Sequence, residues 1–301
     1  MTKKIIAKIS EGLGNQLFMY SNAYAIAKKF NINFYIDPYS GYYNKNVRNY
    51  MLNNFNISSK TAQSNWIFAN NYRNILKKIQ IRLDYFKNNK SFLFEKKNLD
   101  KSTKYLPINL ENTNNEIYID GNFESEKYFF EYRNQLLSEF TLKNNEIYKQ
   151  NCYFKMIRDY NVVSISIRQN RFSERIGNIY SKESIIKSDI LVKKTVDYIY
   201  KSISFFKQKI NSPKFLIWSN DFKNLENYFP KNEFTFVQNS KNKELTDFFL
   251  LTQCKNFIIG PSTFSWWGAW LSKNSDKICV RPSNINPSNN LDFWPDSWIS
   301  I

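Results

Sequence analysis

The sequence predicts an α/β protein with parallel sheets, and three observations lead to that class. Short apolar runs, typical of buried strands, alternate with segments in which apolar residues recur every three to four positions, as in helices. Helices between consecutive strands are the connections that parallel sheets need. A chain of 301 residues is also long enough for two domains. We therefore expect two unequal α/β halves, residues 1–150 and 151–301, that face each other across a cleft.

The N-terminal half begins with a βαβ pattern. The apolar run from Ile5 to Ile9 predicts a strand, the segment EGLGNQ predicts a turn after it, and NFYID predicts a second strand. The intervening helix is expected from about Leu17 to Phe30, because apolar residues there recur at helical spacing: Leu17, Tyr20, Tyr24 and Ala27.

The middle of the chain, residues 39–115, is irregular, polar and basic, but it contains one helical pattern. Four apolar residues fall on one helical face while basic residues occupy the rest of the circumference: Ile75, Ile79, Leu83 and Phe86. Such a helix can lie on a membrane surface. The pattern favours a helix packed on the protein's own core, because ordinary surface helices share it.

The C-terminal half alternates most regularly. The runs VVSISI, KFLIW, FTFV, NFIIG and KICVRP predict strands. Helices are predicted between them around Val192 to Ile210, near Leu225, in ELTDFFLLTQ, and after Ser262. Helices on both faces of such a sheet leave ligands to bind at the carboxyl ends of its strands.

The composition excludes several kinds of chemistry. The chain contains no histidine, which excludes Ser-His-Asp and Cys-His catalysis and HExxH zinc sites. Its three cysteines lack CxxC spacing, predict neither a disulfide framework nor a zinc site, and are expected to be buried. A formal net charge of +17 favours an anionic partner. The start of the chain does not resemble a signal peptide and no long apolar run occurs, so we expect a cytoplasmic protein.

Polar side chains follow four of the predicted strands. The first turn has two glycines ahead of a helix, an arrangement that suits a phosphate or a simple tight turn. Two arginines after VVSISI suit a phosphate or a solvated loop. The strand KFLIW is followed by Ser and Asn residues, which suit a ligand or a helix cap. The strand NFIIG is followed by Ser and Thr residues, which suit a ligand or the cap of a helix whose tryptophans belong to the core. Together these strand ends predict a pyrophosphate-bearing ligand, a nucleotide or nucleotide sugar.

Four blocks in the sequence are more specific than any single strand end. They are GLGNQLFMYSNAYAIAKKF, GNFESEKYF, LIWSND and ELTDFFLLTQCKNFIIGPSTFSWWGAWLS. In this order, across nearly the whole chain, they resemble the conserved blocks of glycosyltransferase family 11, the α-1,2-fucosyltransferase group. The family's HxRRGD block falls on Ser166–Arg171, where this chain reads SIRQNR and keeps only Arg168.

The resemblance implies a GT-B-like fold of two Rossmann-like domains, with the acceptor on the N-terminal side and the donor on the doubly wound C-terminal side. It implies a GDP-sugar donor, GDP-fucose above all, transferred with inversion and without a metal or another cofactor. Arg168 is expected to hold the donor phosphate, with Arg171 as a second charge or a plain surface residue. The other expected donor-binding residues are Gly12, Gly14, Asn15, Gln16, Ser219, Asn220, Asp221, Ser262, Thr263, Phe264 and Ser265.

Inverting transfer also needs a base for the acceptor hydroxyl. Glu174 is the first choice, with a structural ion pair as its alternative role, and Glu11 and Asp221 are reserves. The expected acceptor is a galactoside of a surface glycan or its lipid-linked precursor, reached by peripheral contact with an anionic inner membrane face. Transfer of another GDP-linked deoxy sugar and a non-catalytic nucleotide-sugar-binding relative remain alternatives. A nucleic-acid-binding protein is disfavoured, because the basic residues are spread and no such motif occurs.

Overall fold

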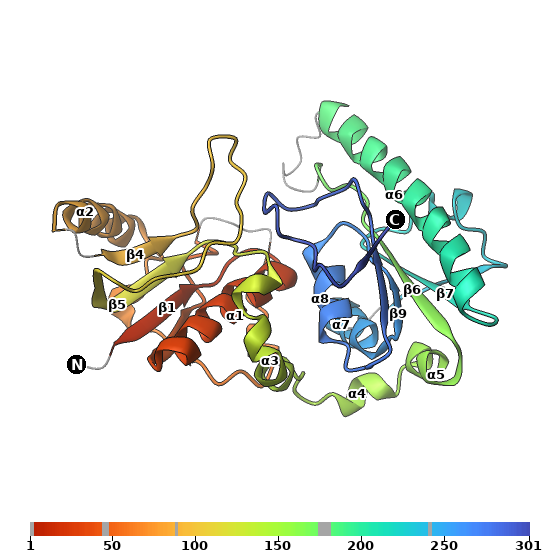
Figure 1. Cartoon of the computed structure of the whole chain (residues 1–301), viewed down its shortest axis with the longest axis horizontal. Coiled ribbons are helices and arrows are strands. Elements are labelled where there is room, and N and C mark those ends of the chain that lie inside the picture. Colours follow the sequence, from red (N-terminus) through yellow and green to blue (C-terminus); the bar gives the residue numbers. More distant parts are fainter. Residues whose placement is uncertain (1–2, 44–47, 88–89, 174–181, 240–242) are drawn as a thin grey trace. The chain divides into compact units, whose positions relative to one another are not determined.

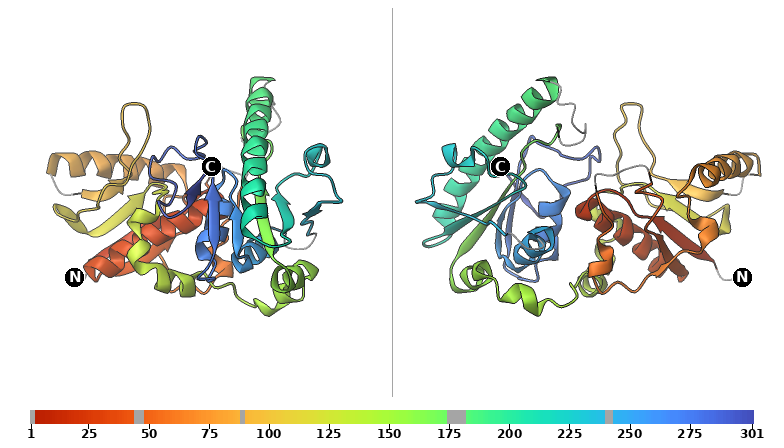
Figure 2. Two further views of the ribbon diagram at one scale, coloured as in Figure 1. Left: turned by 45° about the vertical axis from the view of Figure 1, so that its right-hand side comes forward. Right: turned by 180° about the vertical axis from the view of Figure 1, so that it is seen from behind.

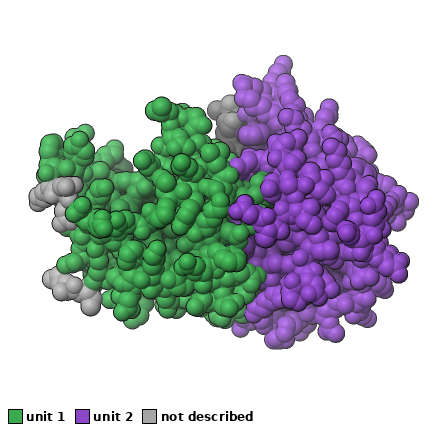
Figure 3. Space-filling model, viewed as in Figure 1, with its two compact units in different colours: residues 1–143, 288–295 green, residues 144–287, 296–301 purple. Residues whose placement is uncertain are grey.

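The computed structural model describes residues 3–43, 48–87, 90–173, 182–239 and 243–301. The chain divides into two compact units, shown in green and purple in Figure 3. Unit 1 comprises Met1–Lys143 and Ser288–Pro295, and unit 2 comprises Asn144–Pro287 and Asp296–Ile301. Each unit has its own parallel sheet, so the predicted α/β class is confirmed. The return of residues 288–295 to unit 1 is a feature that the sequence pattern does not show.

Unit 1 is built on a five-stranded sheet with the order β3-β2-β1-β5-β4, in which all neighbours are parallel. Its strands are β1 (Lys4–Lys8), β2 (Asn33–Asp37), β3 (Lys60–Thr61), β4 (Lys90–Phe94) and β5 (Thr113–Asp120). Its helices are α1 (Leu13–Phe30), α2 (Asn71–Lys87) and α3 (Arg133–Glu139), with the 3-10 turns η1 (Leu52–Asn54), η2 (Ser64–Trp66), η3 (Glu126–Tyr128) and η4 (Phe130–Tyr132).

Helix α1 packs against β1 and β2 and is the most deeply buried helix of unit 1 (Figure 1). It begins at Leu13, four residues before the predicted start, because the extended backbone of Gly12 already forms the N-cap. It ends at Phe30, and the C-cap residue Asn31 adopts the left-handed conformation typical of this position. The early start places the glycine turn directly on a helix N-terminus.

The opposite face of the unit 1 sheet carries an aromatic cluster. Side chains alternate between the two faces of a strand, and Ile6 and Tyr118 belong to the cluster while their neighbours point away. Trp66, Phe68 and Phe92 complete most of it. Helix α2 closes this face through Ile81, which packs on the cluster.

The helix predicted around residues 75–86 is confirmed as α2, but its predicted orientation is wrong. The four residues expected in the core are exposed: Ile75 at 55%, Ile79 at 49%, Leu83 at 49% and Phe86 at 82%. The side of α2 that faces the sheet holds Ile81 and Lys77, whose ammonium group pairs with Asp120 at 3.0 Å. A salt bridge and one aliphatic residue therefore fill the place that the apolar stripe was expected to take.

Unit 2 is built on a six-stranded parallel sheet with the order β11-β10-β9-β6-β7-β8. Its strands are β6 (Val162–Ile167), β7 (Lys214–Ser219), β8 (Phe234–Phe236), β9 (Asn256–Ile258), β10 (Ile278–Arg281) and β11 (Ile299–Ser300). Its helices are α4 (Glu146–Lys149), α5 (Cys152–Asp159), α6 (Lys182–Lys209), α7 (Lys243–Gln253) and α8 (Thr263–Leu271), and the helix predicted near Leu225 is the single 3-10 turn η5 (Leu225–Asn227).

Helices cover both faces of the unit 2 sheet, as predicted for a doubly wound half. Figures 1 and 2 show α6 on one face and α7 with α8 on the other. The predicted apolar stripe of α6 is buried against the sheet, with Ile199 and Phe206 fully enclosed. Strand β6 is buried along its whole length, which fixes the centre of the sheet and the loop that leaves it.

The tryptophans of α8 are core residues. Trp266 and Trp267 are fully buried, and Trp266 stacks on Trp270 with ring centroids 6.0 Å apart. Their predicted packing role is confirmed. Among the cysteines, Cys254 and Cys279 are buried as expected, whereas Cys152 is exposed at the start of the amphipathic helix α5, contrary to expectation.

Candidate active site

The chain reverses its winding direction at β6. From β6 it proceeds outward through β7 to β8, and then crosses back to β9 on the other side of β6. Connections that leave two neighbouring strands in opposite directions open a crevice at their carboxyl ends, which is where ligands bind in open parallel sheets. The loops after β6 and β9 therefore define the candidate site of unit 2.

The loop after β6 is locked to the loop after β7. Gln169 donates its backbone N–H to Oδ1 of Asn220 at 2.9 Å, and Asn220 donates Nδ2 to the carbonyl of Gln169 at 3.0 Å. Gln169 Nε2 also donates to the carbonyl of Asp221 at 2.7 Å. Asn220 thus holds two strand ends together. The capping role that the sequence left open for this segment is not seen, because the N-cap of η5 is Asn224.

Two arginines come from the loop after β6. Arg168 directly follows the buried strand and is partly exposed at the switch point. Arg171 donates from one guanidinium nitrogen to the carbonyl of Pro261 at 3.2 Å and from the other to the carbonyl of Pro287. These two bonds tie the loop after β6 to the loop after β9 and to the segment at Pro287.

The N-terminus of α8 follows β9. Ser262 is the N-cap, and its hydroxyl accepts the N–H of Ser265 at 3.2 Å. Ser265 donates its own hydroxyl to the carbonyl of Gly260 at 2.8 Å. These hydroxyls build the cap, as the capping alternative predicted. The first-turn amides of a helix lack intrahelical acceptors and attract anions.

Two partly exposed side chains stand at the same helix end. Thr263 is the first residue of α8, and Phe264 packs its ring on Phe248 with centroids 5.4 Å apart. A flat aromatic wall beside a helix N-terminus is an arrangement that can take both a ring and a phosphate.

The predicted unit 1 residues lie at the carboxyl end of β1. Glu11 adopts a left-handed backbone with φ of 66°, Gly12 caps α1 without a side-chain bond, and Gly14 is buried in its first turn. Asn15 donates Nδ2 to the Glu11 carboxylate at 3.4 Å. The turn therefore presents helix amides, which is the geometry expected of an anion-binding turn.

Gln16 organises this turn with its side chain. Its amide nitrogen donates to the carbonyls of Glu11 at 2.9 Å and Asn49 at 2.8 Å, and its amide oxygen accepts the N–H of Met51 at 2.9 Å. The side chain is fully buried. These three bonds fix the segment around Asn49 against the glycine turn, so any effect of Gln16 on a donor acts through the shape of the turn.

The structure thus gathers the predicted residues into two groups, one in each unit. Glu174, the first choice for the base, lies outside the described residues. Of the reserves, Glu11 is partly exposed at the unit 1 turn, and Asp221 is partly exposed in unit 2, where Asn170 donates to its carboxylate at 3.1 Å. The donor-binding and catalytic roles of these residues remain predictions.

A network of charges behind the unit 1 turn was missed at the sequence level. Lys8 and Lys77 both pair with Asp120 at the end of β5, while Asp37 at the end of β2 accepts the hydroxyl of Tyr118 at 2.8 Å. Burial raises the pKa of Asp120, but the two ammonium groups outweigh it and hold that pKa below its ordinary value. The tripeptide YID, which ends both strands, is the signal that could have revealed the pair of aspartates.

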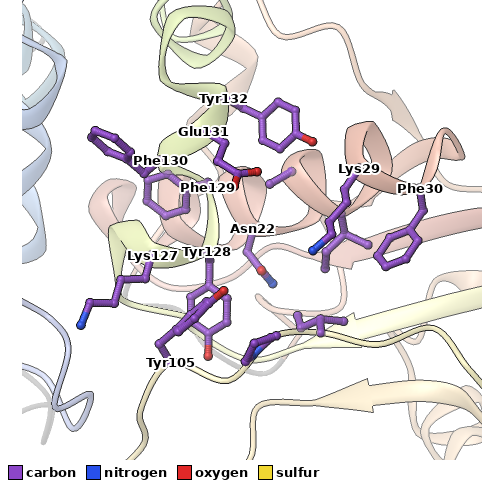
Figure 4. A pocket seen from close by; sticks show the side chains of 14 residues that line it. Asn22, Lys29, Phe30, Tyr105, Lys127, Tyr128, Phe129, Phe130, Glu131 and Tyr132 are labelled. Carbon is purple, nitrogen blue, oxygen red and sulfur yellow. The ribbon is translucent and has the colours of Figure 1, made fainter.

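Unit 1 also contains a hollow of about 80 Å³ between α1, the loop around Tyr105, and η3 with η4 (Figure 4). Aromatic rings surround it, including Tyr105, Tyr128 and Tyr132. Asn22, which is 1% exposed, lines it from α1. Within the described part of the chain, neither polar atom of its amide has a hydrogen-bond partner.

Among the described residues, no helix is long and apolar enough to cross a membrane. In the same ranges, no three cysteine, aspartate or glutamate side chains are grouped as metal ligands would be. The absence of a metal or cofactor from the reaction therefore remains a prediction.

Solved structures with similar folds include fucosyltransferases. NodZ α-1,6-fucosyltransferase soaked with GDP-fucose aligns with a TM-score of 0.51, 12% identity, and coverage of 92% of this chain and 97% of that one. A mutant of Arabidopsis thaliana FUT1 in complex with GDP aligns with a TM-score of 0.52 and 11% identity, and the alignment covers 94% of this chain and 71% of that one. These likenesses establish a GT-B-like fold, as predicted.

The sequence comparisons are more specific. An alpha-1,2-colitosyltransferase of Escherichia coli is 27% identical over 311 residues, covering 99% of this chain and 98% of its own. The O-antigen biosynthesis glycosyltransferase WbnK of Escherichia coli is 29% identical over 318 residues, covering 97% and 99%. The model of the family Glycosyl transferase family 11 matches residues 4–299, nearly the whole chain. The protein is therefore a glycosyltransferase and belongs to glycosyltransferase family 11.

Proposed function

We propose that this protein transfers a 6-deoxyhexose, fucose in the first instance, from a GDP-linked donor to a galactoside hydroxyl with inversion and an α-1,2 linkage. The observation that carries the proposal is the switch point of unit 2, where Arg168, Arg171 and the N-terminus of α8 come from adjacent strand ends. Family membership and fold relatives solved with GDP-fucose support the same donor class.

The chemistry asked of these groups is charge stabilisation. As the bond between the sugar's anomeric carbon and the β-phosphate oxygen breaks, negative charge develops on the departing GDP. Arg168 and the α8 amides are suited to stabilise that charge, because both act as fixed donors at one strand edge. The glycine turn of unit 1 is a second helix N-terminus for a phosphate or for the acceptor. We propose that no metal or other cofactor takes part.

A carboxylate is proposed to accept the proton of the attacking hydroxyl on the face of the sugar opposite the leaving group. Glu174 remains the first candidate, ahead of Glu11 and Asp221. Replacement of Glu174 by Gln should lower turnover at least about 100-fold while GDP binding persists. Turnover near the wild-type rate would transfer the role to one of the reserves.

A second donor is favoured by a specific observation. One relative that matches the full length of this chain is a colitosyltransferase, and colitose differs from fucose by the loss of one ring hydroxyl. Transfer of such a dideoxy sugar from GDP is the alternative. A third candidate is a non-catalytic protein that binds a nucleotide sugar, because the HxRRGD block is changed in this chain.

Unit 1 is proposed as the acceptor side. The hollow at Asn22 suits a sugar, because aromatic rings pack on the apolar faces of pyranoses and an amide bonds their hydroxyls. Asn22 is ten residues along α1 from Gly12, about 15 Å at the helical rise. A sugar bound there would be a distant unit of an oligosaccharide or lipid-linked acceptor, such as an O-antigen precursor at the inner face of the membrane.

Thermal unfolding with a panel of ligands tests the donor class. A nucleotide at about 100 times its dissociation constant stabilises the folded state by about 2.7 kcal/mol. GDP and GDP-sugars should stabilise the protein, whereas ADP, UDP and CDP should not. Release of GDP from GDP-fucose or GDP-colitose in the presence of a galactoside then identifies the sugar. Stabilisation by no nucleotide would remove the proposed function.

A further inference from the structure

Helix α2 turns its apolar side to solvent. Besides the four stripe residues already named, Tyr72 is 70% exposed and Leu76 is 41% exposed. At about 3.6 residues per turn, the six lie within a stripe of roughly 100°. We call this set the outer stripe: Tyr72, Ile75, Leu76, Ile79, Leu83 and Phe86.

The opposite side of the helix packs against the rest of unit 1. Lys77 pairs with Asp120 and lies 4.7 Å from the ring centre of Tyr118. Ile81 packs on the aromatic cluster, and the carboxylate of Asp84 accepts the N–H of Ser91 at 2.6 Å. Lys77, Ile81 and Asp84 are spaced by four and then three positions, so they share one face of the helix, and this face points away from the outer stripe. The orientation of α2 is therefore fixed by specific bonds, and the outer stripe faces outward because of them.

Positive charge borders the outer stripe. The helix sequence NYRNILKKIQIRLDYFK contains five basic residues and one acidic one, and that acid, Asp84, is bound to β4. Lys78 and Arg82 are exposed and lie one turn apart along one flank of the stripe. Tyr85, next to Phe86, is 84% exposed. Figures 1 and 2 show α2 beside β4 on the outside of unit 1.

From this juxtaposition we propose that α2 is a membrane-docking helix whose outer stripe enters the interface of an anionic lipid bilayer. A helix in the plane of an interface needs an apolar face that enters the acyl boundary and basic residues beside it that meet anionic headgroups. Exposed tyrosine and phenylalanine suit the same depth. The charge around the stripe selects this partner, since a second copy of the chain would bring the same cations against each other. The proposal stands independently of the donor sugar.

Vesicle co-sedimentation of the full chain tests the proposal. The protein should bind vesicles of phosphatidylcholine with about 30% phosphatidylglycerol and bind phosphatidylcholine alone much more weakly. Binding should fall at about 0.5 M NaCl, where charges are screened beyond about 4 Å. Equal binding to both vesicles, or to neither, would overturn the proposal.

Two variants assign the binding to α2. The double substitution Ile79→Gln with Leu83→Gln should weaken binding at least tenfold, because it interrupts the outer stripe. Lys78→Gln with Arg82→Gln should weaken it by about 25-fold on anionic vesicles, at about fivefold for each basic residue near the surface. All four side chains are exposed, so circular dichroism should show unchanged folding.

A matched control is available in unit 2. Ile186 and Ile190 are exposed on α6 at 57% and 49%, and their replacement by Gln removes comparable apolar surface from a different helix. This control should leave vesicle binding unchanged; a loss equal to that of the α2 variant would overturn the assignment to α2. Sedimentation velocity in the absence of lipid should show one oligomeric state for all variants. A wild-type dimer that dissociates on Ile79→Gln with Leu83→Gln would assign the outer stripe to a second copy instead.

An activity assay distinguishes failure of the membrane-docking proposal from failure of the proposed function. With a water-soluble galactoside as acceptor, GDP release by the α2 variants should stay within about twofold of wild type, since none of the four substituted residues belongs to the candidate active site. Loss of vesicle binding with intact turnover supports docking. Vesicle binding by a wild-type protein that fails to bind GDP would leave docking in place and remove only the function.

Discussion

The backbone of Gly260 lies directly against the carbonyl group of Ser166. A Cβ atom added to Gly260 would come within 2.0 Å of the Ser166 oxygen and within 2.8 Å of its carbonyl carbon. Both contacts are with backbone, which cannot rotate away as a side chain would. The end of β6 and the segment after β9 can therefore approach each other only because residue 260 lacks a side chain, and this approach forms the floor of the switch point.

Gly260→Ala should consequently separate the two strand ends. We expect the free energy of unfolding to fall by about 1 to 3 kcal/mol, as for overpacked interiors, and GDP affinity to fall as well, because Ser166 and Gly260 carry the two loops of the site. Urea unfolding and calorimetric titration with GDP measure both effects. Gly12→Ala is the control for stability: a Cβ there meets only the Arg48 side chain at 4.0 Å. Equal stability of the two variants would contradict the argument.

Arg168 should dominate GDP binding. Arg168→Ala removes a charge-assisted contact of about 1.5 to 3 kcal/mol, which corresponds to a loss of about 10- to 100-fold in GDP affinity by calorimetry. Arg168→Lys should recover only part of it, because an ammonium cannot donate bidentately. Arg158→Ala removes the same charge from the exposed end of α5, ahead of β6, and should leave GDP binding intact. Equal losses in both alanine variants would point to overall charge instead of a site.

The unit 2 strands and the tryptophan helix could be predicted from sequence because their signals are local. Strand β6 is an uninterrupted apolar run, and the capping serine of α8 stands directly ahead of its helix. The role of the Asn220 amide could not be predicted in the same way. It bonds to the backbone of Gln169, 51 positions away in sequence, and such a partner is set by tertiary structure.

The orientation of α2 shows where periodicity fails. A stripe of apolar residues indicates a helix, but it does not say which side faces the protein. The ion pair of Lys77 with Asp120 decides that orientation, and its partners are 43 positions apart in sequence. Sequence pattern also missed the strands β4 and β5. The apolar run that would indicate β5 is short, because the strand begins with the polar segment TNNE and becomes buried only from Ile117 onward.

Asp247 should make stability depend on pH. Burial raises the pKa of this α7 carboxyl to about 6, from 3.8, against the opposing effects of Asn239 and Lys243. A folded-state pKa above the unfolded value means that stability is fully present below about pH 4 and is lost as pH rises through 6. Asp247→Asn removes this pH-dependent loss of stability and keeps an oxygen that can accept the hydrogen bond from Asn239. The variant should exceed wild type by up to about 2 to 3 kcal/mol at pH 7.5 in urea unfolding and by little near pH 4. A constant difference across this range would contradict the assignment.

Asn22 should separate folding from acceptor binding. A buried amide without a partner costs about 1 to 3 kcal/mol, so Asn22→Leu, which keeps the number and branching of side-chain heavy atoms, should raise the free energy of unfolding by about 1 kcal/mol. If the hollow takes a distant acceptor sugar, the same change should raise KM for an oligosaccharide acceptor while KM for a simple galactoside and kcat stay unchanged.

Ser21→Ala is the matched control for Asn22→Leu. Ser21 is its neighbour in α1, is fully buried and does not line the hollow, and within the described ranges its hydroxyl also lacks a partner. Its replacement should change neither acceptor KM. A rise in oligosaccharide KM for Asn22→Leu alone assigns the hollow to the acceptor, because both variants remove an unpartnered polar group from the same helix. Unchanged KM in both variants would leave Asn22 as a purely structural residue and remove the hollow from the acceptor path.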